Sequence, residues 1–247
     1  MLKNKKNKED IKPKVTWLLP VKNGMPYLRE CLNSIYKQSY TNHEVLAWVN
    51  NCDDNSLEEL NHWIPKKIKG EIIYDKPYDN LGECLARMVE YSKTEFLARI
   101  DCDDTNHKNR LEKQINIITT SENIAAVGSW MNIMNQNGRI ISSGKKPTNN
   151  SKIIMWDLLF RNPFYHPTML LRRSKVLQAG NYSSLKTAQD YDLWFRLIKY
   201  GEMRTIEEPL LNYRKVSDSV SNKYKEDRKK IESELFNKYG SDFFGLK

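Results

Sequence analysis

Residues 95–105 read EFLARIDCDDT, a short apolar run that ends in three acids. The run EFLARI (95–100) has the length and apolar content of a buried strand. The acids Asp101, Asp103 and Asp104 follow within four positions, and neighbouring carboxylates repel one another. The cluster would therefore destabilise the chain unless a cation offsets its charge.

The apolar runs that precede this stretch alternate with segments that predict helices. Three more strands are predicted, at VTWLLP (15–20), EVLAWVN (44–50) and GEIIYD (70–75), with helices between them at 26–38, 56–63 and 81–92. The helix at 56–63 is expected to open with Ser56 as N-cap and Glu59 completing a capping box. The resulting βαβαβαβ order predicts an α/β fold with a mostly parallel central sheet and helices on both faces.

Polar segments follow three of these predicted strands. They read PVKN (20–23), NNCDD (50–54) and DCDD (101–104). In parallel α/β sheets, ligands bind beyond the carboxyl ends of the strands. We therefore expect these three separated segments to meet at one rim and to form one site.

After Asn106 the order of elements changes. The sequence predicts a helix at 110–121, a hairpin of 125–135 and 139–144 around an Asn-Gly turn, and a helix at SKIIMWDLLFR (151–161). A strand at HPTMLLRR (166–173), a helix from AQDYDLWFRLIKYG (188–201) and short strands around Pro209 follow. We expect a basic tail (1–14), one domain (15–221) and a charged C-terminal helix (222–247).

Composition restricts the classes of protein to consider. The chain has 247 residues, a net charge of +9 and a mean hydropathy of -0.71, and no run approaches 18 apolar residues, so no transmembrane helix is expected. No apolar signal region follows the N-terminus, which predicts a cytoplasmic protein. The four cysteines form no C-x-x-C pair and are expected to be free thiols.

The lysine runs allow two interpretations, a solvated surface or attraction to anionic lipid or phosphate groups. No nucleic-acid-binding motif is present, so no nucleic-acid partner is expected.

The acidic cluster fits more than one chemistry. It could cap a helix, or its carboxylate oxygens could bind Mg²⁺ or Mn²⁺, which take one or two protein carboxylates together with substrate phosphates. DCDDT (101–105) matches the D-x-D-x-T of phosphatases of the haloacid dehalogenase type. Those enzymes carry the motif on their first strand, whereas here it follows the fourth, which counts against the phosphatase.

A second class of enzyme is indicated by a set of sequence stretches that occur in the same order as in a known family. They read VTWLLPVKNGMPYLRECLNSIYKQSY (15–40), NLGECLAR (80–87), ARIDCDD (98–104), NRLEKQI (109–115), NPFYHPTMLLRR (162–173), AQDYDLWFRL (188–197) and PLLNYR (209–214). Over nearly 200 residues the chain resembles family 2 of the inverting nucleotide-sugar glycosyltransferases. The resemblance implies the GT-A fold, a Rossmann-like α/β architecture.

The resemblance also implies roles for individual residues. Pro20, Val21, Lys22 and Asn23 would line the base and ribose pocket, Asn51 would face the base, and Arg87 or its neighbours would approach the sugar-diphosphate. Asp101 and Asp103 would hold the ribose and the metal, with Asp104 as a second ligand or a support. Asp190, in QDYDLW, would be the catalytic base, although it could instead cap its helix.

Three further residues are candidates for contact with the acceptor or with phosphate. His166 could be structural or could reach the active site. Trp194 fits a buried helical face but lies close to the proposed base. Arg214 could pair with the pyrophosphate or with a surface acid.

The chain departs from the family pattern at two places. The second strand ends Asn50-Asn51, where the family commonly has two acids and the second binds uracil. Val216 stands where the family commonly has a histidine that reaches the metal, and valine cannot be a ligand.

We therefore expect a metal-dependent inverting glycosyltransferase of the hexosyltransferase type that uses Mn²⁺ or Mg²⁺. It would transfer a sugar from a UDP-sugar to a glycan or lipid-linked acceptor in surface polysaccharide biosynthesis. It could lie peripherally on an anionic membrane surface at the inner face. The alternatives are the phosphatase and a degenerate relative that binds nucleotide without turnover.

Overall fold

The strands and helices of the first hundred residues alternate as predicted. The structure, a computed structural model, describes residues 12–74, 77–144, 146–216 and 225–244. Its first elements are β1 (Val15–Val21), α1 (Leu28–Tyr36), β2 (His43–Val49), α2 (Ser56–Trp63), β3 (Gly70–Tyr74), α3 (Leu81–Tyr91) and β4 (Phe96–Arg99). β1 pairs in parallel with β2 and with β4, and β2 pairs in parallel with β3.

The second half of the chain extends the same sheet with mostly antiparallel pairs. Its elements are β5 (Thr105–Asn106), α4 (Arg110–Ile118), β6 (Ile124–Met134), β7 (Ile140–Ser143), α5 (Ser151–Leu158), η1 (His166–Thr168), β8 (Leu170–Arg172), α6 (Arg173–Gln178), α7 (Gln189–Leu197), β9 (Glu202–Arg214) and α9 (Lys225–Phe244). The described residues form one nine-stranded sheet in the order β3-β2-β1-β4-β8-β6-β9-β5, with β7 paired to β6. The mixed α/β fold and the hairpin are confirmed.

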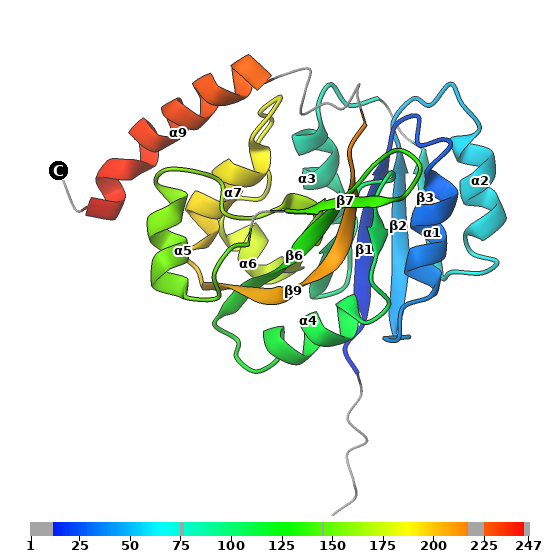
Figure 1. Ribbon diagram of the computed structural model, residues 1–247, viewed down its shortest axis with the longest axis horizontal. Coiled ribbons are helices and arrows are strands. Elements are labelled where there is room, and N and C mark those ends of the chain that lie inside the picture. The colour runs from blue at the N-terminus through cyan, green and yellow to red at the C-terminus, as the bar shows by residue number, and fades with distance from the viewer. Residues whose placement is uncertain (1–11, 75–76, 145, 217–224, 245–247) are drawn as a thin grey trace, which may run out of the picture.

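Helices cover both faces of this sheet, as the alternation predicted (Figure 1). On one face, α1, α2 and α4 bury Leu32, Leu60 and Leu111 against the strands. On the other face, α3, α5, α6 and α7 pack through residues such as Leu85 and Trp194. Burying apolar surface on both faces stabilises the sheet and leaves only the ends of its strands accessible to a ligand.

Three local predictions differ from the structure. The predicted strand 166–173 begins as the 3-10 turn η1, in which Pro167 lacks the N–H that a strand pair needs, and pairing begins only at Leu170. The segment around Pro209 is one continuous strand, β9, and the proline pairs with Trp130 where the register shifts. The capping box is also wrong, because Ser56 Oγ instead accepts a hydrogen bond from the Gly24 N–H.

The C-terminal helix α9 packs on α7. The Tyr239 ring stacks on Phe195 with 5.2 Å between ring centroids, and its hydroxyl donates to Asp192 Oδ1 at 2.9 Å. Leu235 is buried beside them. The predicted tail residues 1–11 and the ends of the predicted helix at 222–224 and 245–247 lie outside the described residues. None of the helices that the structure describes is long and apolar enough to cross a membrane.

Candidate active site

The loops after the parallel strands meet at one rim, as expected from the polar strand ends. The Asn50 side chain donates to the Tyr78 carbonyl at 3.1 Å and accepts from the Tyr78 N–H at 2.9 Å, which joins the loops after β2 and β3. The Asn50 N–H donates to the Val21 carbonyl, which joins the end of β2 to that of β1. Hydrogen bonds therefore hold three loops together at the position predicted for the nucleotide.

The loop after β1 is fixed by residues that follow β2. The Gly24 N–H donates to Ser56 Oγ at 2.8 Å, and the Met25 N–H donates to Asp54 Oδ2 at 2.9 Å. The Asp53 N–H donates to Asn23 Oδ1 at 3.0 Å. These bonds fix the backbone of the turn that follows β1.

The predicted nucleotide-binding residues lie on these loops. Lys22, Asn23 and Asn51 are exposed, and Pro20 is half-buried. The Val21 side chain is buried in the core, so only its backbone belongs to the rim. The rim thus brings together four of the five positions as accessible side chains.

Two buried arginines lie next to the acidic cluster. Arg99 is fully buried, and its guanidinium donates to Asp101 Oδ1 at 2.5 Å. Arg214 is also fully buried, and its backbone N–H donates to Asp104 Oδ1 at 2.8 Å. The cations that offset these carboxylates are therefore supplied in part by the chain itself, which answers part of the question that the acidic cluster raises.

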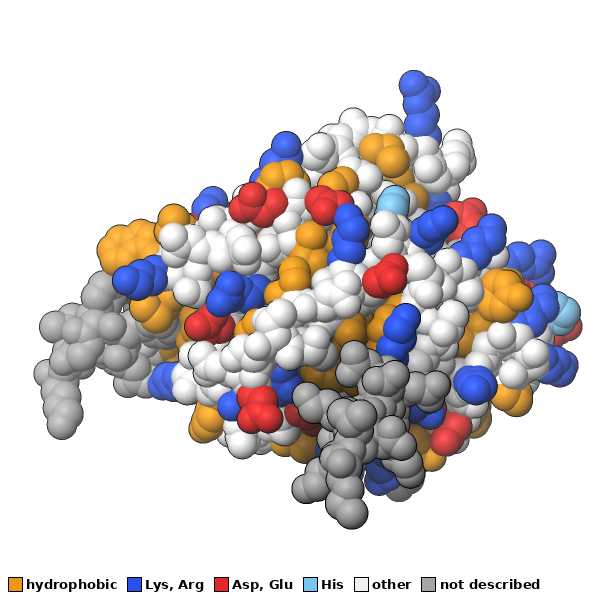
Figure 2. Space-filling model, turned by 90° about the horizontal axis from the view of Figure 1, so that it is seen from below, with side chains coloured by type: hydrophobic (Ala, Val, Ile, Leu, Met, Phe, Trp, Pro, Cys, Tyr) orange, Lys and Arg blue, Asp and Glu red, His pale blue; other side chains and the backbone are white. Residues whose placement is uncertain are grey.

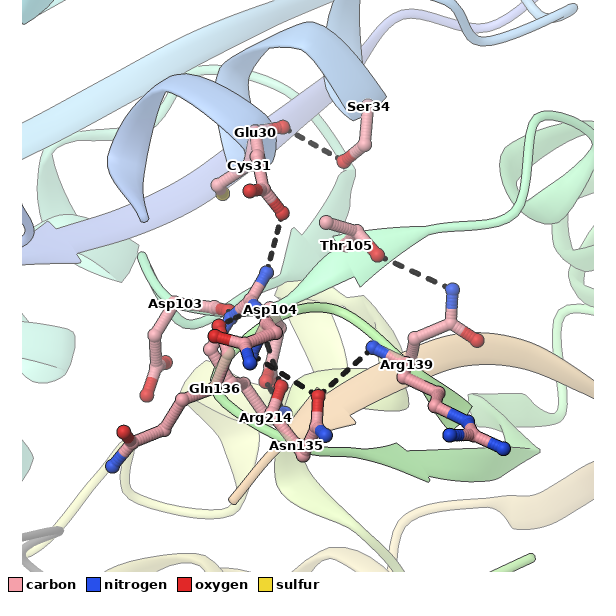
Figure 3. A network of polar contacts seen from close by, with 12 residues as sticks. Glu30, Cys31, Ser34, Asp103, Asp104, Thr105, Asn135, Gln136, Arg139 and Arg214 are labelled. Carbon is pink, nitrogen blue, oxygen red and sulfur yellow. Dashed lines mark hydrogen bonds and ion pairs between the residues drawn. The ribbon is translucent and has the colours of Figure 1, made fainter. Parts of the chain in front are cut away.

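Arg214 is the centre of a polar network (Figure 3). Its Nε donates to the Asp103 carbonyl at 2.9 Å, and its two terminal nitrogens donate to the Gln136 carbonyl at 2.8 Å and to Glu30 Oε2 at 2.5 Å. The guanidinium also lies 4.4 Å from the centroid of the Tyr27 ring. All three nitrogens are thus engaged by the protein, and Arg214 is a positioning residue of the acidic loop.

The three acids differ in what surrounds them. Burial, together with repulsion from Asp101, raises the pKa of Asp103 to about 6. Burial raises the pKa of Asp104 well above its usual range, and its Oδ2 is buried with no hydrogen-bond partner in the described chain. The Asp103 carboxylate accepts a hydrogen bond from its own backbone N–H, and no other described residue donates to it. The carboxylate points away from Arg214 in Figure 3.

This donor set fits a hard divalent ion. Carboxylate oxygens are the ligands that Mg²⁺ and Mn²⁺ prefer, and a cation would offset the repulsion that raises the pKa of Asp103. Among the described residues, however, no group of three or more His, Cys, Asp or Glu side chains is arranged to hold a metal ion. Asp103 is the residue that would hold it, and the remaining ligands would come from elsewhere.

Asp190 lies in the first turn of α7 and is half-buried. Its Oδ2 accepts a hydrogen bond from Asn162 Nδ2 at 2.7 Å, while Ala188 is the N-cap of the helix. Burial raises the pKa of the Asp190 carboxyl, and the charge of Arg228 on α9 partly offsets that rise. A carboxyl whose pKa is raised by its surroundings is suited to accept a proton near neutral pH.

The segment before α7 brings Asp190 toward the rim. Asn80, at the start of α3, donates from its side chain to the Ser184 carbonyl at 3.2 Å. The buried phenol of Tyr182 lies within electrostatic range of both Arg99 and Asp190. Tyr182 is therefore a common neighbour of the proposed base and of the arginine that pairs with the acidic loop.

Three predicted residues are placed differently from the rest. The Arg87 side chain is exposed on α3 and pairs with Glu90 at 3.6 Å, so the structure does not bring it to the rim. Trp194 is fully buried in the core between Phe164 and His166. His166 is buried as well, its Nε2 lies 2.8 Å from the Tyr182 hydroxyl, and burial holds its pKa well below the usual range.

Sequence reasoning missed three residues that shape the site. Arg99 and Asn162 lie within stretches that resemble the family, but nothing local shows that they contact Asp101 and Asp190. Arg228 lies on the charged C-terminal helix among several lysines, and the sequence does not distinguish it from them. A cluster of acids indicates that arginines elsewhere in the chain pair with them, but the sequence does not show which arginines these are.

The geometry is that of an α/β fold whose polar loops meet beyond the carboxyl ends of parallel strands. The chain belongs to glycosyl transferase family 2, because the model of that family matches residues 16–180. The match includes DCDDT and removes the phosphatase alternative. It ends before Asp190, Arg214 and Arg228.

Relatives with biosynthetic names support the assignment. The chain is 30% identical over 194 residues to the O-antigen biosynthesis glycosyltransferase WbnJ of Escherichia coli, which covers 76% of this chain and 74% of that one. It is 25% identical over 195 residues to the amylovoran biosynthesis glycosyltransferase AmsE of Erwinia amylovora. The matched region is 78% of this chain and 73% of AmsE.

Solved structures confirm the fold. S. aureus TarS 1–349 in complex with UDP-GlcNAc superimposes with a TM-score of 0.70 at 18% identity, over 85% of this chain and 60% of that one. The mannosyltransferase PcManGT of Pyrobaculum calidifontis, in complex with GDP-Man and Mn²⁺, gives a TM-score of 0.64 at 14% identity, over 86% and 60%.

Proposed function

We propose that this protein is a metal-dependent inverting glycosyltransferase of the hexosyltransferase type that acts in surface polysaccharide biosynthesis. The observation that carries the proposal is the pair of carboxylates in unlike surroundings, one in the acidic loop and one at the start of α7. Asp103 is half-buried beside two buried arginines and receives no hydrogen bond from another described residue, and Asp190 is held by Asn162 with a raised pKa. Two acids with different surroundings suit two roles, donor binding and proton transfer.

In this mechanism Asp190 takes the proton of the acceptor hydroxyl. The hydroxyl oxygen then forms a bond to the anomeric carbon as the bond from that carbon to the diphosphate oxygen breaks. Asn162 holds the carboxylate in place during this step. A divalent ion at Asp103 would supply Lewis acidity toward the leaving diphosphate. One displacement with no covalent intermediate inverts the anomeric configuration.

We propose a UDP-sugar as donor. The Asn51 side chain is exposed at the rim, and its carbonyl can accept from the N3–H of uracil. The complex of TarS with UDP-GlcNAc supports this choice, whereas the complex of PcManGT with GDP-Man makes GDP the competing donor to test. Thermal-shift measurements with UDP and GDP, each with and without Mn²⁺, decide between the two bases.

For the acceptor we propose a glycan or a lipid-linked saccharide, and for the location the cytoplasm at an anionic membrane surface. The names of WbnJ and AmsE support the acceptor. Figure 2 shows Lys and Arg side chains spread over one face with acids between them, so charge alone marks no patch there. Exposed apolar residues are concentrated on and after α5, where Trp156 and Phe160 are 56% and 64% exposed beside Lys152 and Arg161.

Tryptophan beside basic residues is typical of side chains at a membrane interface. The membrane proposal is tested by sedimentation with vesicles that contain or lack anionic lipid. The substitutions Trp156→Ser and Phe160→Ser should lower binding to the anionic vesicles. Equal sedimentation with neutral vesicles would contradict it.

The proposed activity is tested by Asp190→Asn, which keeps the shape of the side chain and removes the base. We expect sugar transfer to fall by about 10²–10⁴-fold while Mn²⁺-dependent UDP binding is retained. Asp157→Asn is the matched control, because Asp157 pairs with the exposed Arg161 instead. Nucleotide binding by a wild-type protein that transfers no sugar would favour the degenerate relative.

A further inference from the structure

The turn between β6 and β7 is fixed directly to the acidic loop. One guanidinium, that of Arg214, donates to the backbone carbonyls of both Asp103 and Gln136, at 2.9 and 2.8 Å. Because both carbonyls accept hydrogen bonds from the same small planar group, the two backbone segments lie close together. The guanidinium nitrogen that donates to Gln136 also donates to the Asn135 carbonyl at 3.4 Å, so Arg214 holds the backbone of Asn135 and Gln136 close to that of Asp103.

The turn itself is rigid. Asn135 Oδ1 accepts from the N–H groups of Asn137 and Arg139 at 3.1 and 3.0 Å, and Gly138 completes the turn with a φ of +79°. The Gln136 side chain is exposed, and no hydrogen bond joins its carboxamide to the rest of the described chain. Figure 3 shows the side chains of Gln136 and Asp103 extending from Arg214 toward the same side.

The acidic cluster offers fewer metal ligands than its sequence suggests. Asp104 is fully buried, with Oδ1 bonded to the Arg214 N–H, and Asp101 is paired with Arg99. Asp103 is the carboxylate that receives no hydrogen bond from another described residue, and the described acids do not converge on one point. An ion at Asp103 therefore needs another hard oxygen, and a carboxamide oxygen is a ligand of this kind.

We infer that the side-chain oxygen of Gln136 is the second protein ligand of the divalent ion that Asp103 holds. The remaining ligands come from the donor diphosphate and water. This inference rests on the proposed function and assigns the metal site to two distant segments, the loop after β4 and the β6–β7 turn. Arg214 sets the separation of the two ligands.

The test measures Mn²⁺ affinity without turnover, by isothermal titration with UDP at saturation and, in parallel, with GDP. Gln136→Ala should weaken Mn²⁺ binding by about 10-fold or more, since changes around metal ligands typically cost 10–100-fold. Gln136→Glu supplies a charged oxygen at the same place and should tighten Mn²⁺ binding. The matched controls are Asn137→Ala and Asn137→Glu, because Asn137 is exposed in the same turn and its turn bond uses only its backbone.

Each outcome decides the inference. Unchanged Mn²⁺ affinity in Gln136→Ala overturns it. Equal tightening by Gln136→Glu and Asn137→Glu also overturns it, since that result reports only charge near the site. Weaker UDP binding in Gln136→Glu would also overturn it, because that result indicates that the Gln136 amide N–H donates to phosphate and that its oxygen does not bind the metal. If the wild-type protein binds neither nucleotide with Mn²⁺, the proposed function fails, whereas failure of the inference alone leaves wild-type binding intact.

Discussion

Replacing Arg214 by lysine isolates the role of its planar guanidinium from that of its charge. The arginine reaches the Asp103 and Gln136 carbonyls and Glu30 through three different nitrogens. A lysine has one ammonium on a flexible stem and cannot reproduce this fixed fork. Arg214→Lys therefore keeps the positive charge but leaves at least one backbone carbonyl without its donor.

The size of the effect follows from these contacts. A buried polar group that loses its partner costs about 1–3 kcal/mol, so one or two carbonyls give about 1–6 kcal/mol. The Glu30 side chain is 58% exposed, so the ion pair itself contributes at most about 1 kcal/mol. We expect Arg214→Lys to lower the free energy of unfolding by about 1–6 kcal/mol, and Glu30→Gln by about 0–1 kcal/mol.

The assay is urea unfolding without ligand, with the same measurement on both variants, followed by Mn²⁺ titration at temperatures where both are folded. Arg214→Lys should also weaken Mn²⁺ binding, because the separation of Asp103 and Gln136 is no longer fixed. Two results would refute the reasoning. One is a loss in Arg214→Lys below about 0.5 kcal/mol, the range of ordinary surface substitutions. The other is an equal loss in Glu30→Gln.

Two further predictions concern the base and its surroundings. Arg228→Gln removes a charge that lowers the pKa of Asp190, so the acidic limb of the kcat–pH profile should move to higher pH, while Arg228→Lys should leave it in place. An unmoved limb in Arg228→Gln would contradict this. Gly82→Ala places a Cβ 2.1 Å from the Ser183 carbonyl, so we expect a loss of about 1–3 kcal/mol in thermal unfolding and a lower transfer rate. A stable, fully active Gly82→Ala would show that the segment before α7 moves freely.

The pH prediction depends on what surrounds Asp190. Arg228 faces it from α9, Tyr182 from the segment before α7, and Asn162 donates to it. Burial raises the pKa of Asp190, so the base is lost as the pH falls through that raised value, above the ordinary range of aspartate. Deleting the cation extends this loss further toward neutral pH.

The parallel half of the sheet could be predicted because each of its elements carries a local signal. VTWLLP and EVLAWVN are apolar runs of strand length, and β1 and β2 form over them. The second half could be predicted less well because long-range pairing decides it. β9 runs through Pro209 because the shift in register opposite Trp130 accommodates a residue without an N–H, and no local pattern shows that shift.

The site was predictable to the extent that its residues come from strand ends. The polar segments after β1, β2 and β4 marked the rim, but the contacts that give each acid its character are distant. Arg214 lies 110 residues from the aspartate that its N–H bonds, and Asn162 lies 28 residues from Asp190. Tertiary contacts therefore decide which carboxylates are paired and which is not, and the sequence does not display these contacts.

The antiparallel pairing of β4 with β8 has a consequence for engineering. Only three residue pairs join the parallel half of the sheet to the rest at this point, and Arg110 and Gln114 of α4 reinforce the junction through the carbonyls of Met169 and Thr168. The rim for the nucleotide lies before the junction in the chain, and the proposed base lies after it. Chimeras that exchange the chain after α4 between relatives should thus exchange acceptors and keep the preference for the nucleotide base, whereas the proposed metal site changes with them, because Gln136 and Arg214 also lie after the junction.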